Sequence, residues 1–204
     1  MKRCFIFGAL PVDDMPVAPS PDDMVIAADK GYRTVTALGI TPDIIVGDFD
    51  SLSEIPEADN VIKLDVRKDD TDTEHAVSTA LAMDCDDFII YGAVGGKLDH
   101  TLGNIAVAER IALSGGRSVF FGDDSTFTVV HNSSYEFDAR DSGRISVISL
   151  SEISRGVTIK GLSFEADDIN LNRATTLGIS NAFIGKPSSI SVTDGTLLIV
   201  YDTK

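Results

Sequence analysis

Cysteine and tryptophan are scarce in this chain of 204 residues: it has two cysteines, Cys4 and Cys85, and no tryptophan. Two cysteines cannot form the disulfide framework of a small secreted protein, and no pair of C-x-x-C motifs offers ligands for structural zinc. The sequence also has no apolar run near the roughly 20 residues of a membrane span. Its apolar start is interrupted by Gly8 and Pro11, which makes it too short for a secretion signal. We therefore expect a cytoplasmic protein that does not bind membranes.

Basic residues are also scarce. Lys and Arg number 17 against 32 Asp and Glu, giving a formal net charge of -15 at pH 7. Such a surface repels the phosphate backbone of nucleic acids and anionic lipid, so we expect neither as a partner. The hydrophobic share of 43% and the charged share of 24% are those of a folded globular protein. The length fits one large domain or two small ones.

Residues 1–122 alternate short apolar runs with stretches of helical spacing. Helices are predicted at 32–38, 73–83 and 99–113, and in the third Leu98, Leu102, Ile105 and Ala108 mark the predicted buried stripe. Thr71 and Glu74 have the spacing of a capping box. The predicted strands are 4–7, 24–28, 44–46, 61–64, 88–91 and 118–121. This alternation favours an α/β domain, a mostly parallel sheet with helices on both faces.

Residues 123–204 lose the helical periodicity and show short alternating runs separated by Gly, Asn, Asp and Ser. Strands are predicted at 126–130, 144–150, 157–159, 178–184, 189–192 and 196–201. Asp194 and Gly195 lie between the last two and are typical of a hairpin turn. We expect an all-β sandwich domain packed closely on the first, because no low-complexity linker separates the halves.

Acidic residues follow several of the predicted parallel strands. Asp29 follows the second predicted strand, and Asp48 and Asp50 follow the third. A cluster ending at Asp72 follows the fourth strand, and a segment ending at Asp99 follows the fifth. Ligands of open parallel sheets bind at the carboxyl ends of strands, so these carboxylates are expected to share one edge. Their mutual repulsion, about 4 kcal/mol for a pair at about 4 Å, favours a divalent cation between them.

The oxygen-only donor set favours Mg²⁺ or Ca²⁺ over zinc. Asp48 and Asp50 are two residues apart, so in an extended segment both carboxylates point to the same side. A D-x-D pattern by itself is weak, and acidic turn residues also cap helices or solvate loops. Their repetition at four strand ends favours the metal.

The segment from Gly92 to His100 lies between a predicted strand and a predicted helix. Gly92, Gly95 and Gly96 let backbone N–H groups approach an anion, and Lys97 adds positive charge. The segment is not a Walker A loop, because a leucine follows Lys97. A plain glycine-rich turn with a solvated lysine is the alternative, and these residues alone do not decide between the two.

Together these segments resemble the bacterial thiamine pyrophosphokinase family. The resemblance spans nearly the whole chain, and its second and fourth segments are highly specific. The segments are Ala28-Asp29-Lys30-Gly31, residues 42–51 (PDIIVGDFDS), Lys68-Asp69-Asp70-Thr71-Asp72, residues 92–105 (GAVGGKLDHTLGNI), and more weakly Gly178-Ile179-Ser180-Asn181 with residues 195–198 (GTLL). Lys30 stands where the family usually has a glycine, which either alters backbone approach at this turn or supplies a group for a phosphate.

The resemblance implies an N-terminal α/β domain, a C-terminal β-sandwich, and a homodimer that binds thiamine between the α/β domain of one subunit and the sandwich of the other. It implies transfer of the diphosphate of ATP to thiamine, giving thiamine diphosphate and AMP with Mg²⁺. The residue roles that it implies are as follows: Asp48, Asp50 and Asp72 handle metal and diphosphate; Asp29, Ser51, Lys68, Gly95, Gly96, Lys97 and His100 line the nucleotide; Asp99, Ser180 and Asn181 face thiamine.

Direct attack of the thiamine hydroxyl on the β-phosphorus requires mainly alignment and charge neutralisation. Asp99 is the predicted group that orients the hydroxyl, in preference to Asp72, because it should lie nearer thiamine. Two other readings stay open at this point. A Mg²⁺-dependent nucleotide-sugar glycosyltransferase would use Asp48 and Asp50 but leaves residues 95–100 unexplained, and a non-catalytic nucleotide sensor would need none of the carboxylates for chemistry.

Overall fold

The parallel part of the fold is built from strands that the sequence makes apolar along their whole length. We describe residues 1–47, 61–63 and 70–203 of a computed structural model. It divides into two compact units, unit 1 with residues 1–107 and 118–123, and unit 2 with residues 108–117 and 124–204. No helix in these described ranges is long and apolar enough to cross a membrane.

Unit 1 contains a parallel sheet. Its strands are β1 (Arg3–Phe7), β2 (Met24–Ala28), β3 (Ile44–Gly47), β4 (Val61–Lys63), β5 (Asp87–Tyr91) and β6 (Arg117–Phe121). They lie in the order β6-β5-β1-β2-β3-β4. β1 pairs in parallel with both β2 and β5, β2 with β3, and β3 with β4. The carboxyl ends of β1 to β5 therefore lie at one edge.

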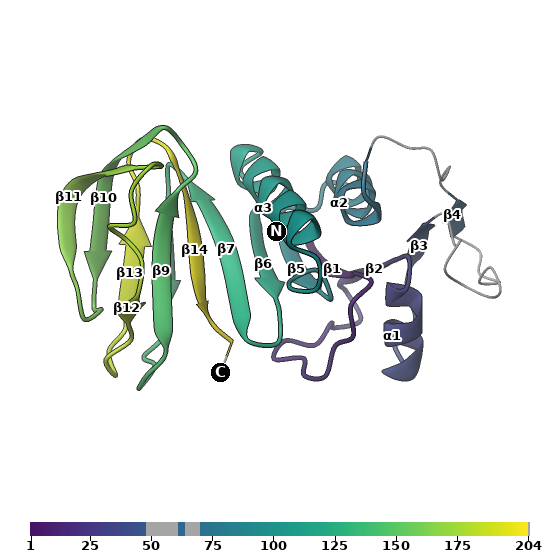
Figure 1. Cartoon of the computed structure of the whole chain (residues 1–204). Helices are drawn as coiled ribbons and strands as arrows, with labels where there is room; N and C mark the ends of the chain where they lie inside the picture. The colour runs from purple at the N-terminus through teal and green to yellow at the C-terminus, as the bar shows by residue number, and fades with distance from the viewer. Residues whose placement is uncertain (48–60, 64–69, 204) are drawn as a thin grey trace. The chain divides into compact units, whose positions relative to one another are not determined.

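Helices cover both faces of this sheet. They are α1 (Gly31–Ala37), α2 (Asp72–Ala82) and α3 (Leu98–Leu113). Val35 of α1 packs with alternate strand residues such as Phe5 and Val25, whereas α2 buries Ala76 and Ala80 and contacts β1, β2 and β3. Figure 1 shows α1 on one side of the sheet and α2 and α3 on the other. Alternating side chains point to opposite faces, so a strand with both faces covered is apolar throughout.

The predicted buried stripe of α3 is right at Ala108, which is fully buried, but wrong at its two leucines. Leu98 and Leu102 are 74% and 57% exposed, whereas the buried residues of the helix are Asn104, Val107, Ala108, Ile111 and Ala112. At about 100° per residue, the buried face lies roughly a quarter turn around the helix from the predicted stripe, so the leucines lie on the outside. The rotation is set by Asn104, whose side-chain amide donates to the Ala93 carbonyl oxygen at 2.6 Å.

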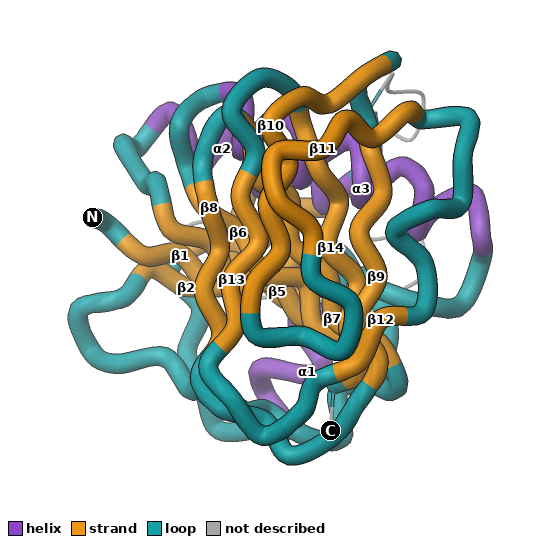
Figure 2. Tube along the Cα trace, turned by 90° about the vertical axis from the view of Figure 1, so that its left-hand side faces the viewer, coloured by secondary structure: helices purple, strands orange, loops and turns teal. Residues whose placement is uncertain are grey.

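Unit 2 is an antiparallel sandwich. Its strands are β7 (Ser125–His131), β8 (Ser134–Phe137), β9 (Arg144–Ser149), β10 (Ile153–Lys160), β11 (Ala166–Asn172), β12 (Asn181–Ala182), β13 (Ser188–Ser191) and β14 (Thr196–Asp202). One sheet contains the run β12-β9-β14-β7, and the other has the order β11-β10-β13-β8. Figure 2 shows β10 and β11 in front of β9 and β14. The sheets share one apolar core, which includes Val147 and Leu197 from one and Val157 and Ile190 from the other. The predicted fold class, an α/β domain followed by a β-sandwich, is thus confirmed.

The predicted hairpin at Asp194 and Gly195 is wrong. β13 pairs with β10 and β8, whereas β14 pairs with β7 and β9. The turn therefore joins the two sheets. Two hydrogen bonds hold the backbone of the turn. The Arg155 N–H donates to the Asp194 carbonyl oxygen at 2.8 Å, and the Gly195 N–H donates to the Asn132 side-chain oxygen at 2.8 Å. The flanking strands face each other across the core because both bury apolar side chains there.

β11 was not predicted from the sequence, and the run 178–184 forms a strand only at Asn181–Ala182. β11 carries Asp167 and Asp168 and lies at the outer position of its sheet, paired only with β10 in the described part of the chain. Charged residues are common on such edge strands because they discourage pairing with other chains. Because of these charges, the strand lacks the alternation of apolar and polar residues by which strands are predicted.

Candidate active site

The carboxyl ends of β1 and β5 meet where the strand order of the sheet reverses. From β1 the chain builds β2, β3 and β4 on one side and then β5 and β6 on the other. Gly8 N–H donates to the Tyr91 carbonyl at 2.7 Å, and a Cβ on Gly8 would stand 2.6 Å from the Gly92 oxygen. Two glycines therefore let these strand ends touch. Ligands of doubly wound sheets bind outside such a reversal.

Asp29 lies at the same edge, directly after β2. It has a positive φ of 48°, and its backbone N–H donates to the Val46 carbonyl of β3 at 2.7 Å. Two positions further on, a Cβ on Gly31 would overlap the Phe7 carbonyl of β1. The turn after β2 is thus held against the ends of both neighbouring strands.

Lys30, the residue that departs from the family pattern, occupies an ordinary helical conformation with φ -62° and ψ -15°. Its side chain is exposed. No glycine is needed at this position, because the close approach to β1 is made by Gly31. The substitution leaves the backbone of the turn unstrained and adds a positive charge at this edge of the sheet.

The loop between β5 and α3 carries the predicted residues Gly95, Gly96 and Lys97, all exposed. Both glycines have positive φ values, 97° and 65°. The loop is held from α3 by two side chains. Thr101 Oγ1 accepts from the Gly95 N–H at 3.2 Å, and the Asn104 amide donates to the Ala93 oxygen. An exposed but anchored loop at a helix N-terminus is a geometry suited to an anion.

Asp99 and His100 lie in the first turn of α3 and are exposed. Asp99 Oδ1 accepts from the His100 backbone N–H at 2.9 Å. A carboxylate in the first turn also interacts favourably with the helix dipole. Asp99, Lys97 and His100 therefore extend from the same end of α3 as the glycine loop.

Asp72 is the first residue of α2. One half of the predicted capping box is present: the Thr71 hydroxyl oxygen accepts a hydrogen bond from the Glu74 backbone N–H at 3.2 Å. Next to it, Asp70 Oδ2 lies 3.0 Å from His75 Nδ1. The start of α2 thus presents a capped turn with several carboxylates in sequence.

Four predicted site residues, Asp48, Asp50, Ser51 and Lys68, lie outside the described residues. The structure describes β3 up to Gly47 and β4 up to Lys63, which are the carboxyl-terminal residues of these strands. Within the ranges that the structure describes, no three His, Cys, Asp or Glu residues form a metal-binding group. The described site residues of unit 1 are Asp29, Asp72, Gly95, Gly96, Lys97, Asp99 and His100, of which Gly95 to His100 are brought together in a single loop and helix turn.

Ser180 and Asn181 belong to unit 2 and differ in exposure. Ser180 is exposed, has a positive φ of 62° and donates its N–H to Ser146 Oγ at 3.1 Å. Asn181 is only 6% exposed, and its amide is bound to both the N–H and the carbonyl of Phe164, at 2.9 and 2.6 Å. Asn181 therefore holds the backbone beneath Phe164, whose side chain is 72% exposed.

Several residues that shape this edge were not singled out from the sequence. They are Gly8, which lets β1 touch β5, and Thr101 and Asn104, which anchor the glycine loop. The available signal was the i, i+3 spacing of Thr101 and Asn104 one turn after the loop. A polar side chain on the buried face of a helix can be recognised only when that face is known.

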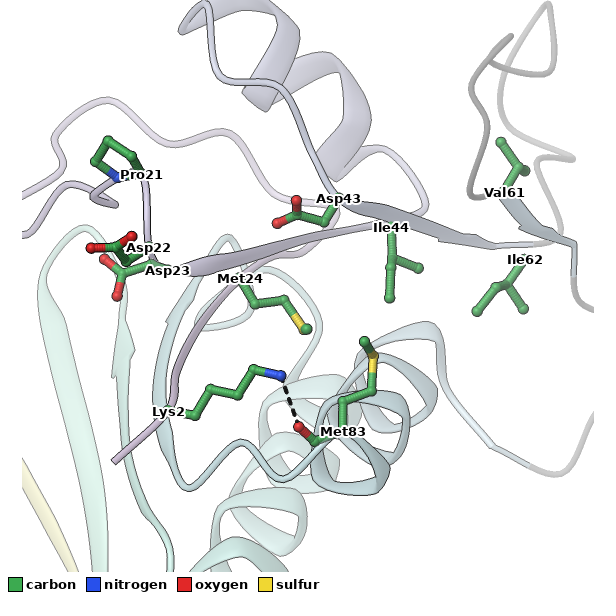
Figure 3. Close-up of a pocket in the computed structure, with 10 residues that line it drawn as sticks. All are labelled: Lys2, Pro21, Asp22, Asp23, Met24, Asp43, Ile44, Val61, Ile62 and Met83. Carbon is green, nitrogen blue, oxygen red and sulfur yellow. Dashed lines mark hydrogen bonds between the residues drawn. The ribbon is translucent and has the colours of Figure 1, made fainter.

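A cavity in the described part of the chain lies away from this edge. It has a volume of about 610 Å³ and is lined by residues at the amino ends of the strands, among them Lys2, Asp23 and Asp43 (Figure 3). Asp23 accepts a hydrogen bond from Arg3 Nε at 2.9 Å. Burial acts to raise the pKa of Asp23, but hydrogen bonds from Arg3 and Ser20 outweigh it and hold this pKa below its usual value.

Comparison with known proteins places the whole chain in one family. Residues 19–120 match the model "Thiamin pyrophosphokinase, catalytic domain", and residues 134–197 match "Thiamin pyrophosphokinase, vitamin B1 binding domain". Thiamine pyrophosphokinase of Bacillus subtilis (strain 168) is 29% identical over an alignment of 185 residues, and the match covers 87% of this chain and 86% of the relative.

Solved structures agree with this match. A thiamine pyrophosphokinase structure from Bacillus subtilis has a TM-score of 0.88 at 26% identity and covers 100% of both chains. One from Geobacillus thermodenitrificans has a TM-score of 0.83 at 25% identity and covers 99% of this chain and 98% of the other. The two domain models in order, the full-length relative and the shared architecture show that this chain belongs to the thiamin pyrophosphokinase family.

Proposed function

We propose that this protein is a thiamine diphosphokinase, which transfers the diphosphate of ATP to the hydroxyl of thiamine and releases AMP. The observation that carries the proposal is the match of both family domains, in order, on one chain. The exposed and anchored loop of residues 95–100 supports it, because it lies after β5 at the edge where the strand order reverses.

The proposed nucleotide site uses Asp29, Ser51, Lys68, Gly95, Gly96, Lys97 and His100. Among the described residues, Lys97 is an exposed cation and the Gly95–Gly96 backbone is exposed at the N-terminus of α3. These features suit the negative charge of a polyphosphate. Lys30, also exposed, adds a further cation after β2 and is proposed to strengthen nucleotide binding.

Asp48, Asp50 and Asp72 are proposed to hold Mg²⁺. Their oxygen donors fit a hard divalent cation, and the described member of the set, Asp72, stands at the open first turn of α2. When bound, Mg²⁺ would neutralise charge on the phosphate oxygens.

The proposed chemistry is attack of the thiamine hydroxyl oxygen on the β-phosphorus of ATP, with cleavage of the bond to the oxygen that leaves with AMP. The hydroxyl proton is released as the new P–O bond forms. Asp99 is proposed to accept a hydrogen bond from this hydroxyl and so orient it. Lys97 is proposed to balance the charge that develops on the diphosphate, which is the main requirement of phosphoryl transfer.

Thiamine is proposed to bind in a homodimer, between Asp99 in unit 1 of one subunit and Ser180 and Asn181 in unit 2 of the other. Exposed apolar side chains lie near Asn181, which supports an interface or ligand surface there. Leu177, Ile179 and Ile184 flank it in the sequence, and Phe164 is the residue whose backbone it binds. We further propose that the domain boundary lies at residues 122 and 123, and that the protein works in the cytoplasm with ATP and thiamine as its ligands.

The test is a ³¹P NMR assay of the purified chain with ATP, thiamine and Mg²⁺. The expected result is AMP formed in step with thiamine diphosphate. Formation of ADP, or transfer of a sugar from a nucleotide sugar, would instead favour another transferase. Binding of ATP without turnover would favour a nucleotide sensor and would overturn the proposed activity.

A further inference from the structure

Both cysteines of the chain lie in one cluster of sulfur atoms beneath the parallel sheet. Cys85, just after α2, has its Sγ 3.8 Å from Met24 Sδ of β2. Cys4 of β1 is paired in register with Met24, so the two side chains stand next to each other on the same face. Each of the two thiols also contributes to the pKa shift of the other. Three soft donors thus converge from β1, β2 and the segment after α2.

The cluster is buried but has an open side. Cys4 is 0% exposed and Cys85 2%, whereas Met24 is only partly buried and lines the cavity of about 610 Å³ at the amino ends of the strands. Figure 3 shows the Met24 and Met83 side chains pointing into this cavity. An ion that reached the cavity would therefore meet a thioether before the two thiols.

We propose that Cys4, Cys85 and Met24 form a binding site for a soft monovalent metal ion of the Cu(I) class. Thiolate and thioether sulfurs select such ions over Mg²⁺, which prefers oxygen. An ion about 2.3 Å from each sulfur in a trigonal arrangement holds the sulfurs about 4 Å apart. The Met24 and Cys85 sulfurs already stand at nearly this separation.

Binding exchanges protons for the metal. The two thiols lose two protons, one monovalent ion binds both thiolates and the thioether, and the site carries a net charge of one minus. In the metal-free protein, burial raises the pKa of both thiols, so they are neutral at pH 7. The Lys2 ammonium acts in the opposite direction on both, and its Nζ is fixed nearby by donating to the Met83 carbonyl at 2.9 Å. This lysine offsets part of the charge of the loaded site.

The site is independent of the proposed kinase activity. Met24 begins β2 and Cys85 precedes β5, so the cluster lies at the amino ends of the strands. The nucleotide loop follows the carboxyl end of β5. Metal binding here can therefore be measured without any reference to turnover.

The test is a titration of the full-length, reduced protein with Ag(I), a soft monovalent ion that does not undergo redox cycling, followed by Cu(I) in competition with a coloured chelator. Native mass spectrometry should show one ion bound, and a pH indicator should show two protons released per ion. Met24→Leu, which keeps the volume of the side chain, should weaken binding by about tenfold or more. Met15→Leu is the matched control and should leave the affinity unchanged.

Cys4→Ala and Cys85→Ala should each abolish the one-to-one complex, with circular dichroism checking that the variants are folded. Three outcomes would overturn the proposal: an unchanged affinity in Met24→Leu, release of a single proton, or a product lighter by two hydrogens with no metal, which would mean a Cys4–Cys85 disulfide. Because Met24→Leu needs no loss of a buried thiol, misfolding of the cysteine variants would leave the test intact.

Discussion

The two units place their predicted site residues in different ways. In unit 1, Gly95, Lys97 and Asp99 lie exposed on a loop and a helix turn, and the residues that fix the loop, Thr101 and Asn104, stand behind them. In unit 2, the predicted residue Asn181 is itself the buried anchor, and the exposed group is Phe164, which it holds. A predicted ligand-facing asparagine can thus act by holding the backbone of another residue.

The largest expected effect concerns the carboxylates of unit 1. Asp48→Asn or Asp50→Asn should abolish turnover in the ³¹P NMR assay while leaving the melting temperature nearly unchanged, because each change removes a charge proposed to hold Mg²⁺. Asp123→Asn, an exposed acid in the loop after β6, is the control and should retain activity. Rates near the wild-type value in both site variants would refute the metal assignment.

The next effect is on the stability of unit 1. Gly31→Ala places a methyl group against the Phe7 carbonyl and should lower the free energy of unfolding by about 2–3 kcal/mol. Gly103→Ala is the matched comparison, because a Cβ there meets no atom within 4 Å in the middle of α3. It should raise stability by about 0.5–1 kcal/mol. Urea unfolding measures both, and equal losses would contradict the steric argument.

The two anchoring asparagines test the comparison of the units directly. Asn104→Ala and Asn181→Ala each leave buried backbone groups without their partner and should each cost about 1–3 kcal/mol of stability. Their kinetic effects should separate. Asn104→Ala should raise mainly the KM for ATP, and Asn181→Ala mainly the KM for thiamine. If both changed the same constant, the division of ligands between the units would be wrong.

The smallest expected effect is a pH dependence at the far edge of the sheet. The pKa of Asp23 is lowered in the folded protein, so its ionised form stabilises the fold above the unfolded-state pKa, and this contribution is lost as the pH falls through the folded-state value. Asp23→Asn should cost about 1 kcal/mol at neutral pH and much less near pH 2. A constant difference in urea unfolding across this range would show that the carboxylate charge is not responsible.

Local sequence pattern was sufficient for the parallel unit because its strands are buried on both faces. Runs such as Met24–Ala28 read as strands with no knowledge of their neighbours, and the turn after each one is polar. The glycine loop and the carboxylates at the strand ends followed from the same pattern. Their roles in catalysis, together with the boundary at residues 122 and 123, stay predictions.

Pattern failed where a residue's role depends on a distant partner. Asp194 and Gly195 signal a tight turn, but the pairing of β13 with β10 and of β14 with β9 decides that this turn joins two sheets. The prediction that Leu98 and Leu102 of α3 are buried failed for a related reason. The hydrogen bond from Asn104 to Ala93 sets which side of the helix faces inward.

The sequence by itself determined the fold class, the order of strands and helices in residues 1–122, and the family to which the chain belongs. These depend on periodicity and on short motifs, which are local properties of the polypeptide. Only the tertiary structure decided that Gly8 meets Gly92 and that both cysteines gather at Met24. The reason is physical: such contacts join residues far apart in sequence, and strand order and register alone bring them together.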